Sequence, residues 1–212
     1  MSRTTTRNSN KAKIPVKYWL SFKANTGKFA YWNGEETVEV DNLKVVLLDT
    51  KASITGWSDA QSAKVWSNYA QSTKSENLDV MVGNKKVLSG LYADIKKEVE
   101  DLGGHFTQNL FCIVDLGEGW EIGCVQLSKS ALGSYSEFTS GMKYGELFSK
   151  VLEMSKGDQQ KSGGVKYFAL KLETSDLGDD LANLADEKDL VLQAYFNPKQ
   201  ESEQESEKEA AF

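Results

Sequence analysis

The chain contains 212 residues, with two cysteines, one histidine and a formal net charge of −6. Cys112 and Cys124 lie in apolar stretches and the single histidine has no partner at metal-ligand spacing, so we expect buried reduced thiols and no metal or other cofactor. No apolar run approaches the roughly 18 residues of a membrane-spanning helix, so we expect a cytoplasmic protein with no membrane partner.

The charge is distributed unevenly. The first 17 residues hold five cations and no acid, residues 176–199 hold six acids against two lysines, and residues 200–212 hold five glutamates and one lysine. The body between these segments is close to neutral. Because phosphate binding normally leaves a basic patch, this balance weakens any nucleic-acid prediction based on charge alone.

Residues 14–57 consist of aromatic and β-branched runs separated by turn signals, a pattern that predicts a β-meander. Asn33-Gly34, between KFAYW and TVEV, is typical of a tight hairpin. Residues 58–77 are polar, and their only bulky apolar or aromatic side chains are Val65, Trp66 and Tyr69. They are interpreted as a long loop or a short helix on a loop, and long loops often carry function.

The next elements are a hairpin, a helix and a second hairpin. LDVMV and KKVL, separated by Gly83-Asn84, predict a hairpin over residues 78–88. SGLYADIKKEVEDLGG predicts a helix over 89–102, with Ser89 as its N-cap, apolar residues at helical spacing and a Gly-Gly stop. Residues 105–128 then predict two strands that turn near 116–119.

The C-terminal third predicts shorter elements. KSALGSYSEF and GELFSKVLEM are interpreted as two short helices, residues 157–164 as a loop and VKYFALKLE as a strand. DLGDDLANLADE is interpreted as a short acidic helix and DLVLQAYF as a last strand. Residues 198–212 cannot bury enough apolar surface to offset their chain entropy, so we expect a disordered acidic tail.

The central elements follow the order strand, hairpin, helix, hairpin, which is the order of the five-stranded OB barrel. The predicted fold class is therefore mainly β (α+β), with an OB-fold-like five-stranded barrel, an N-terminal β-meander and C-terminal α/β elaborations. One domain over residues 14–197 is expected between a disordered basic arm at 1–13 and the acidic tail. The arm lacks the apolar region of a secretory signal.

The run WSNYAQ…LDVMVGNKKVLSGLYADIKKEVEDLGGHFTQNLFC, together with a glutamate-rich segment ending in Phe212, resembles the single-stranded DNA-binding proteins of bacteriophages. The tail resembles that of the bacterial single-stranded DNA-binding proteins in being acidic and ending in phenylalanine, although it has no aspartate run and no proline before the last residue. The resemblance covers about residues 44–132 and the tail. It implies non-sequence-specific binding and protection of single-stranded DNA during phage DNA replication, recombination and repair.

Such binding requires cations for phosphates and exposed aromatic faces for bases. The candidate residues lie in or beside the polar segment and in the following hairpin, and they are Trp57, Lys64, Trp66, Tyr69, Lys74, Lys85 and Lys86. The alternative for the aromatic residues is burial in a core, which is open for Trp57 and less favoured for Trp66 and Tyr69. Trp19, Phe29, Trp32, Phe111 and Trp120 are assigned to packing.

The resemblance also assigns two roles to the tail. A tethered polyanion competes with DNA for the binding groove, and when DNA displaces it, the tail recruits replication or recombination proteins. The residues expected to do so are Glu201, Glu203, Glu205, Glu207, Glu209 and Phe212. The alternative is a tail that only confers solubility.

An enzyme is not expected. His105 has no nucleophile arranged beside it, and GEGWEIG lacks the lysine of a phosphate-binding loop. The alternative function is a non-catalytic structural or adaptor protein of a phage particle or replication complex. The oligomeric state stays open, with a homo-oligomer among the alternatives.

Overall fold

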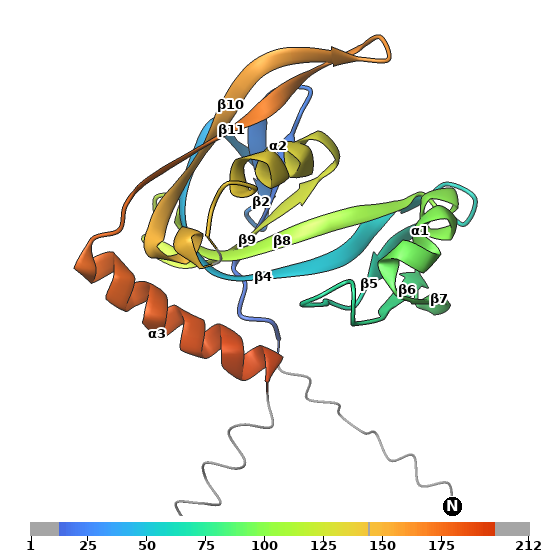
Figure 1. Ribbon diagram of the computed structural model, residues 1–212, viewed down its shortest axis with the longest axis horizontal. Helices are drawn as coiled ribbons and strands as arrows, with labels where there is room; N and C mark the ends of the chain where they lie inside the picture. Colours follow the sequence, from blue (N-terminus) through green and yellow to red (C-terminus); the bar gives the residue numbers. More distant parts are fainter. Residues whose placement is uncertain (1–12, 144, 198–212) are drawn as a thin grey trace, which may run out of the picture.

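The computed structural model of the protein describes residues 13–143 and 145–197 (Figure 1). Within this part of the chain, all strands join one sheet, and helices lie on both of its faces. The strands are β1 (Tyr18–Lys23), β2 (Lys28–Trp32), β3 (Thr37–Val40), β4 (Asn42–Ser58), β5 (Ala63–Ser67), β6 (Leu78–Val82), β7 (Lys85–Gly90), β8 (Gly104–Asp115), β9 (Trp120–Ser128), β10 (Lys150–Ser162) and β11 (Val165–Asp176). The helices are α1 (Tyr92–Asp101), α2 (Lys129–Thr139), the short 3-10 helix η1 (Glu146–Ser149) and α3 (Asp179–Phe196).

The sheet has the strand order β3-β2-β1-β9-β8-β4-β5-β6-β7, and the β10–β11 hairpin joins it at β4. All neighbours are antiparallel except β1 and β9. β4 has 17 residues, and its first part pairs with β10 while its last part pairs with β5. The long β4 and β8 strands therefore connect a large lobe to a smaller lobe made of β5, β6, β7 and α1 (Figure 1).

The mainly β class is confirmed, but the sheet is not closed into a barrel. The predicted order of strand, hairpin, helix and hairpin is present as β4, β6–β7, α1 and β8–β9, but the unpredicted strand β5 is inserted after β4, and β4 pairs with both β5 and β8. β9 pairs with β8 on one edge and with β1 on the other, from Gly123 to Gln126. Because a strand has only two edges, β9 has none left along these residues for closing a barrel onto the smaller lobe.

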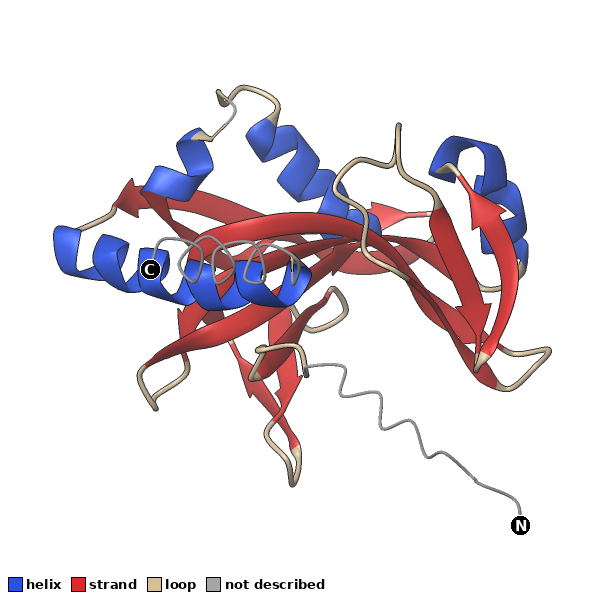
Figure 2. Cartoon of the chain, turned by 90° about the horizontal axis from the view of Figure 1, so that it is seen from below, coloured by secondary structure: helices blue, strands red, loops and turns tan. Residues whose placement is uncertain are grey.

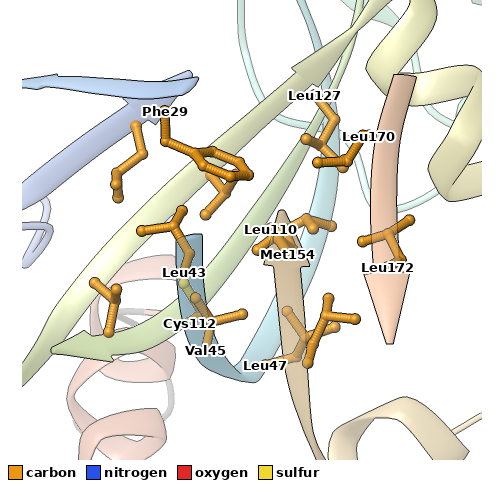
Figure 3. Close-up of a cluster of buried hydrophobic side chains, with 14 of the residues drawn as sticks. Phe29, Leu43, Val45, Leu47, Leu110, Cys112, Leu127, Met154, Leu170 and Leu172 are labelled. Atoms are coloured by element: carbon orange, nitrogen blue, oxygen red, sulfur yellow. The ribbon is translucent and has the colours of Figure 1, made fainter. Parts of the chain in front are cut away.

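The largest core fills the concave side of the large lobe, where the sheet curls around buried apolar side chains and α2 covers them (Figure 3). The backbone N–H of Phe168 in β11 donates to the carbonyl oxygen of Ala24 in the β1–β2 turn at 2.7 Å, which holds the two ends of the curl together. The fully buried members of this core include Leu20, Phe29, Val45, Leu110, Cys112, Leu127, Leu152 and Met154.

Two other cores complete the packing. The second core lies between the opposite face of the sheet and α3, around Phe111, Ile113, Cys124 and Leu192. The third joins α1 to the smaller lobe and contains Ile54, Val65, Val80 and Val99. Both cysteines are buried and free, as predicted, and burial raises the pKa of the Cys112 thiol to about 12.

The meander of β1, β2 and β3, the two central hairpins and α1 agree with the prediction. The Asn33 side-chain oxygen accepts the backbone N–H groups of Glu35 and Glu36, which explains the turn between β2 and β3. The predicted N-cap of α1 is wrong, because Leu91 occupies that position. Ser89 still belongs to β7, and its hydroxyl donates to Asp79 across the hairpin.

Four predicted elements are wrong. The segment 58–77, interpreted as a long loop or a short helix on a loop, contains the strand β5, and its three alternating burial positions were too few to reveal a strand period. In GELFSKVLEM only Glu146–Ser149 is helical, because β10 begins at Lys150. The predicted loop 157–164 is mostly strand, because β10 and β11 continue past the core with exposed polar side chains.

The predicted last strand, 189–196, is the second half of α3. Ala185 and Leu192 are buried in the second core, and Leu181, Leu184 and Phe196 pack against it. This helical spacing crosses the boundary between the two predicted segments, so neither segment alone contained it. Among the described residues, no helix is both long enough and apolar enough to cross a membrane.

Candidate nucleic-acid interface

One face of the sheet carries the aromatic side chains that the sequence singled out. Successive residues of a strand point to opposite faces, so Ile54 enters the core under α1 while Ser53, Thr55 and Trp57 point to the other side. α3 covers one end of this side and leaves the end near β5 without a helix (Figure 2). We call the part left uncovered the tryptophan face, defined by Trp19, Ser53, Thr55, Trp57, Lys64, Trp66, Thr107, Asn109 and Gln126.

Trp57 and Trp66 are exposed on this face, at 54% and 39%. Trp66 on β5 pairs with Thr55 on β4, and Trp57 pairs with Lys64, so all four side chains lie on the same side. The indole Nε1 of Trp66 donates to the carbonyl oxygen of Gly83 at 2.8 Å. This bond holds the ring in one orientation while part of its surface stays open to solvent.

Two glycines set the position of Trp57 at the end of β4. Gly56 pairs with Gly104, and the backbone N–H of Trp57 donates to the carbonyl oxygen of Gly103 at 3.3 Å. A Cβ atom on Gly56 would collide with that same oxygen, and Gly103 has a φ of +82°. The turn from α1 to β8 therefore approaches β4 closely only because these positions lack side chains.

A pocket of about 390 Å³ opens beside Trp66. Tryptophan and tyrosine rings form part of its wall, and hydroxyl and amide groups form much of the rest. Trp19 belongs to both the pocket and the second core, since its ring meets Phe111 edge-on at a centroid distance of 6.5 Å. The lining residues are Trp19, Ser53, Ile54, Thr55, Lys64, Trp66, Ser67, Tyr69 and Gln126.

A hydrogen-bonded amide lies below the pocket. Asn109 is fully buried, and its Nδ2 donates to the Ser53 hydroxyl at 2.9 Å and to the Lys51 carbonyl oxygen at 3.0 Å. Its Oδ1 accepts Nε2 of Gln126 at 3.0 Å. These bonds orient the Gln126 amide at the pocket wall, and they leave its carbonyl oxygen and one N–H available to a ligand.

A second polar pair lies between β4 and β8. The hydroxyl oxygens of Thr55 and Thr107 are 2.6 Å apart, and Thr55 Oγ1 lies 3.4 Å from Nε2 of His105. Burial, assisted by the nearby Lys129 cation, lowers the pKa of His105 below its usual value. The floor of the tryptophan face is therefore polar and uncharged at neutral pH.

Tyr69 lies between the pocket and the second core. Its ring meets Phe111 and Phe196 edge-on, with centroid distances of 5.4 and 5.9 Å, and burial raises the pKa of its phenol. The prediction that Tyr69 is exposed is thus wrong in large part, because α3 brings Phe196 onto its ring. Tyr69 also lines a second, polar pocket of about 540 Å³ together with Lys51, Gln193 and Asn197.

The predicted lysines do not form one cluster. Lys64 is exposed and lines the pocket. Lys86 on β7 lies opposite Met81 on β6, which lies opposite Trp66 on β5, so Lys86 is two strands away from Trp66. Its ammonium group lies 2.6 Å from the Asp79 carboxylate, and this contact lowers the pKa of that carboxyl. Lys85 pairs with Val82, whose side chain enters the core under α1, so it belongs to the opposite face.

Lys74 is exposed in the segment between β5 and β6 and is absent from the pocket lining. The structure therefore brings together Trp57, Lys64, Trp66 and Tyr69, and it separates Lys74 and Lys85 from them. The candidates Glu201, Glu203, Glu205, Glu207, Glu209 and Phe212 lie outside the described residues.

Several residues of this face were not predicted. The assignment of Trp32 to packing is wrong, since 60% of it is exposed, while Phe29 and Phe111 are fully buried as expected. The polar floor had a recognisable signal on β4, where Ser53 and Thr55 alternate with Ala52 and Ile54. On β8 the polar Gln108 between Thr107 and Asn109 interrupts this alternation.

The described residues contain no cluster of histidine, cysteine and carboxylate side chains that could hold a metal ion. Comparisons of the chain with protein-family models, with curated protein sequences and with solved structures found no match.

Proposed function

We propose that the protein binds single-stranded DNA without sequence preference on the tryptophan face. The observation that carries this proposal is the pair of exposed indoles, Trp57 and Trp66, on one side of the sheet with Lys64 beside them. Indole faces stack on any base, and each stacked base contributes about 1–3 kcal/mol to binding. An ammonium group next to the stacking surface attracts the phosphates that link the bases.

The polar floor supports the same function. A side-chain amide offers one acceptor and two donors, and every base edge has a donor or acceptor that such a group can meet. Gln126 is held in place by Asn109 and faces the pocket. It therefore suits any base that enters between Trp19 and Trp66, which favours binding without sequence preference.

We also propose that β4 to β9 represent an open variant of the OB fold. With the β6–β7 hairpin counted as the third element, α1 lies between the third and fourth elements, and β4, the first, pairs with the second, β5, and the fourth, β8. OB folds bind single strands across their second and third strands. The corresponding strands here are β5 and the β6–β7 hairpin, and β5 carries Lys64 and Trp66.

The acidic segment is proposed to compete with DNA for this face. α3 ends at Phe196, whose ring contacts Tyr69, and Asn197 shares a pocket with Tyr69. The described part of the chain thus ends beside the proposed DNA site, and residues 200–212 contribute five glutamates against one lysine. Tethering gives this polyanion a high effective concentration at the site. When DNA displaces it, the segment with Phe212 recruits replication or recombination proteins.

Removal of residues 201–212 tests the competition. We expect the shortened chain to bind oligo-dT more tightly than the full chain at low salt, with the difference shrinking at high salt as screening increases. Equal affinities at low salt would contradict competition without affecting the proposed DNA site.

The proposed setting is the protection of transient single strands during phage DNA replication, recombination and repair, in the cytoplasm of the host cell. This setting depends on the sequence resemblance. The protein is proposed to act without catalysis, as a coat that excludes nucleases.

The direct test is binding of the full chain to a labelled oligo-dT strand and to a matched duplex, measured by fluorescence polarisation across a salt series. We expect tighter binding to the single strand, with affinity falling as salt rises. Equal binding to the two forms would contradict a stacking site, since duplex bases offer no free faces. Absence of binding to either form at low salt would favour the structural or adaptor alternative.

A further inference from the structure

The tryptophan face continues past the pocket onto the β1–β2 hairpin. Trp19 pairs with Cys124 of the second core, so its side chain lies on the same side of the sheet as Phe111. Tyr31 packs against Tyr18 on the other side, in the large core. Trp32 follows Tyr31, and alternation along β2 therefore places Trp32 on the side of Trp19.

Trp19 and Trp32 are also neighbours across the hairpin. Leu20 pairs with Tyr31, so the next position outward on each strand brings the two tryptophans opposite each other. Trp32 is 60% exposed to solvent, more than Trp57 at 54% and Trp66 at 39%. Trp32 lies next to Trp19, which lines the pocket, so it extends the aromatic surface beyond the pocket.

Four of the five tryptophans thus follow one track across the sheet, and the fifth, Trp120, packs against the second core with α3. The track runs from β5 over β4, β8, β9 and β1 to β2. Five strand-to-strand steps of about 4.8 Å span roughly 24 Å across the sheet. The row of Trp66 crosses β4 at Thr55 and the row of Trp19 crosses it at Asp49, so the track also shifts by six residues, about 20 Å, along the strands and is roughly 31 Å long. At the ~3.4 Å rise of a stacked strand this length holds at most about nine nucleotides, and fewer if the strand is stretched.

A lysine lies at the β5 end of the track, and a second lies further along β1, four residues from Trp19. Lys64 lies beside Trp57 at the β5 end. On β1, Ser21 and Lys23 alternate onto the same side as Trp19, and Lys23 is exposed. Between the ends lie the uncharged hydroxyl and amide groups of the floor, among them Ser53, Thr55 and Gln126. An extended single strand fits this track better than an apolar protein partner does, because the track combines aromatic rings with lysines and neutral polar groups.

We infer that single-stranded DNA crosses the sheet from β5 to β2 and that Trp32 is its outermost stacking position. This inference rests on the proposed function and adds a direction, a length and a further binding residue to it. The strand lies across the β-strands, with one end on Trp57 and Trp66, its middle over the pocket at Trp19 and its other end on Trp32.

An oligonucleotide length series tests the inference. The affinity of the full chain for dT3, dT4, dT6, dT8 and dT12 is measured for the unaltered protein and for Trp32→Ala, with Trp66→Ala and Phe148→Ala as companions. Phe148 is an aromatic residue of η1 with 38% exposure, away from the track, and serves as the matched control. Thermal unfolding monitored by circular dichroism verifies that each variant is folded.

For the unaltered protein we expect affinity to rise with length and level off by about nine nucleotides. Trp32→Ala should bind dT8 roughly 5- to 100-fold more weakly, the loss expected for one stacked base, and it should bind dT3 as the unaltered protein does. Trp32→Phe retains a ring and should fall between the two. Phe148→Ala should leave the whole series unchanged.

The two proposals fail in different ways. If Trp32→Ala binds dT8 as tightly as the unaltered protein while Trp66→Ala does not, the track past the pocket is wrong and the DNA site on β4 and β5 stands. If the unaltered protein binds no oligonucleotide at low salt, both the proposed function and the track are overturned. An equal loss for dT3 and dT8 in Trp32→Ala would overturn the assignment of Trp32 to the far end.

Discussion

Trp57 and Lys64 lie opposite each other on β4 and β5, so an exposed indole and an exposed ammonium group share one side of the sheet. They are seven residues apart in the sequence, on either side of a short turn, and the pairing of the two strands brings them together. A single strand of nucleic acid presents the complementary pair of groups, a base face and a phosphate, at every nucleotide.

Replacing the exposed indoles tests the stacking surface. Trp66→Ala and Trp57→Ala should each weaken oligo-dT binding roughly 5- to 100-fold, because each removes about 1–3 kcal/mol of base stacking. The Trp57 side chain is 54% exposed, so the free energy of unfolding should change little in Trp57→Ala. Fluorescence polarisation at fixed salt gives the affinities. Unchanged binding in both variants would remove these residues from the site.

Lys64 and Lys85 form a matched pair of lysines on opposite faces of the smaller lobe. Lys64→Gln should weaken oligo-dT binding and reduce the slope of log affinity against log salt by about one, as expected for one lost phosphate contact. Lys85→Gln removes the same charge from the opposite face and should leave the slope unchanged. The check is a salt titration of both variants, and equal slopes in the two would contradict binding on the tryptophan face.

Asn109 should contribute strongly to stability. It is fully buried, and Asn109→Ala would leave the Ser53 hydroxyl and the Gln126 amide without their partner. Each unsatisfied buried polar group costs about 1–3 kcal/mol, so we expect the free energy of unfolding to fall by at least that much. Asn25→Ala, at an exposed position of the β1–β2 turn, should change it by less than about 0.5 kcal/mol. Urea unfolding of the two variants distinguishes them, and a loss as small as that of Asn25→Ala would contradict the role of the amide.

His105 should make stability depend on pH. Burial, with a smaller contribution from Lys129, lowers the pKa of His105 in the folded protein, whereas the unfolded chain titrates near about 6.5. The unfolded state therefore binds more protons below that pH, and the free energy of unfolding should fall as the pH decreases from about 6.5 to the lowered pKa.

Urea unfolding at pH 7.5 and at pH 5.5 measures this effect. His105 is the only histidine of the chain, so His105→Gln removes the whole histidine contribution and should make the decrease smaller. An equally large decrease in the variant would assign it to carboxyl groups. An NMR titration of the imidazole with a midpoint above about 6.5 would contradict the lowered pKa.

The predictions from sequence succeeded where the signal was local. Alternating apolar residues and turn residues identified the two central hairpins, and helical spacing identified α1. They failed where a neighbour far along the chain decided the structure. The residues of β10 and β11 beyond the core have no burial pattern, and the apolar stripe of α3 crosses two segments that were assigned separately.

The candidate site shows the same division. Lys64 and Trp66 on β5 follow Trp57 on β4 by seven and nine residues across a short hairpin, and this proximity in the sequence was enough to group them. Nothing local distinguishes Trp19 or Trp32 from core tryptophans, because both lie in strands that bury one face. Their role depends on the other face, and only the assembled sheet determines what covers it.

The sequence by itself therefore determined the strands of the meander and of the two central hairpins, the helix α1, the burial of the cysteines and the proximity of aromatic and basic residues near β5. Only the tertiary structure decided that β1 takes the free edge of β9, that the sheet stays open, and that α3 covers Tyr69 but not Trp66. Periodicity and turn residues act between neighbours along the chain. The choice of strand edges and the covering of faces depend on contacts between distant segments, whose identity no local pattern contains.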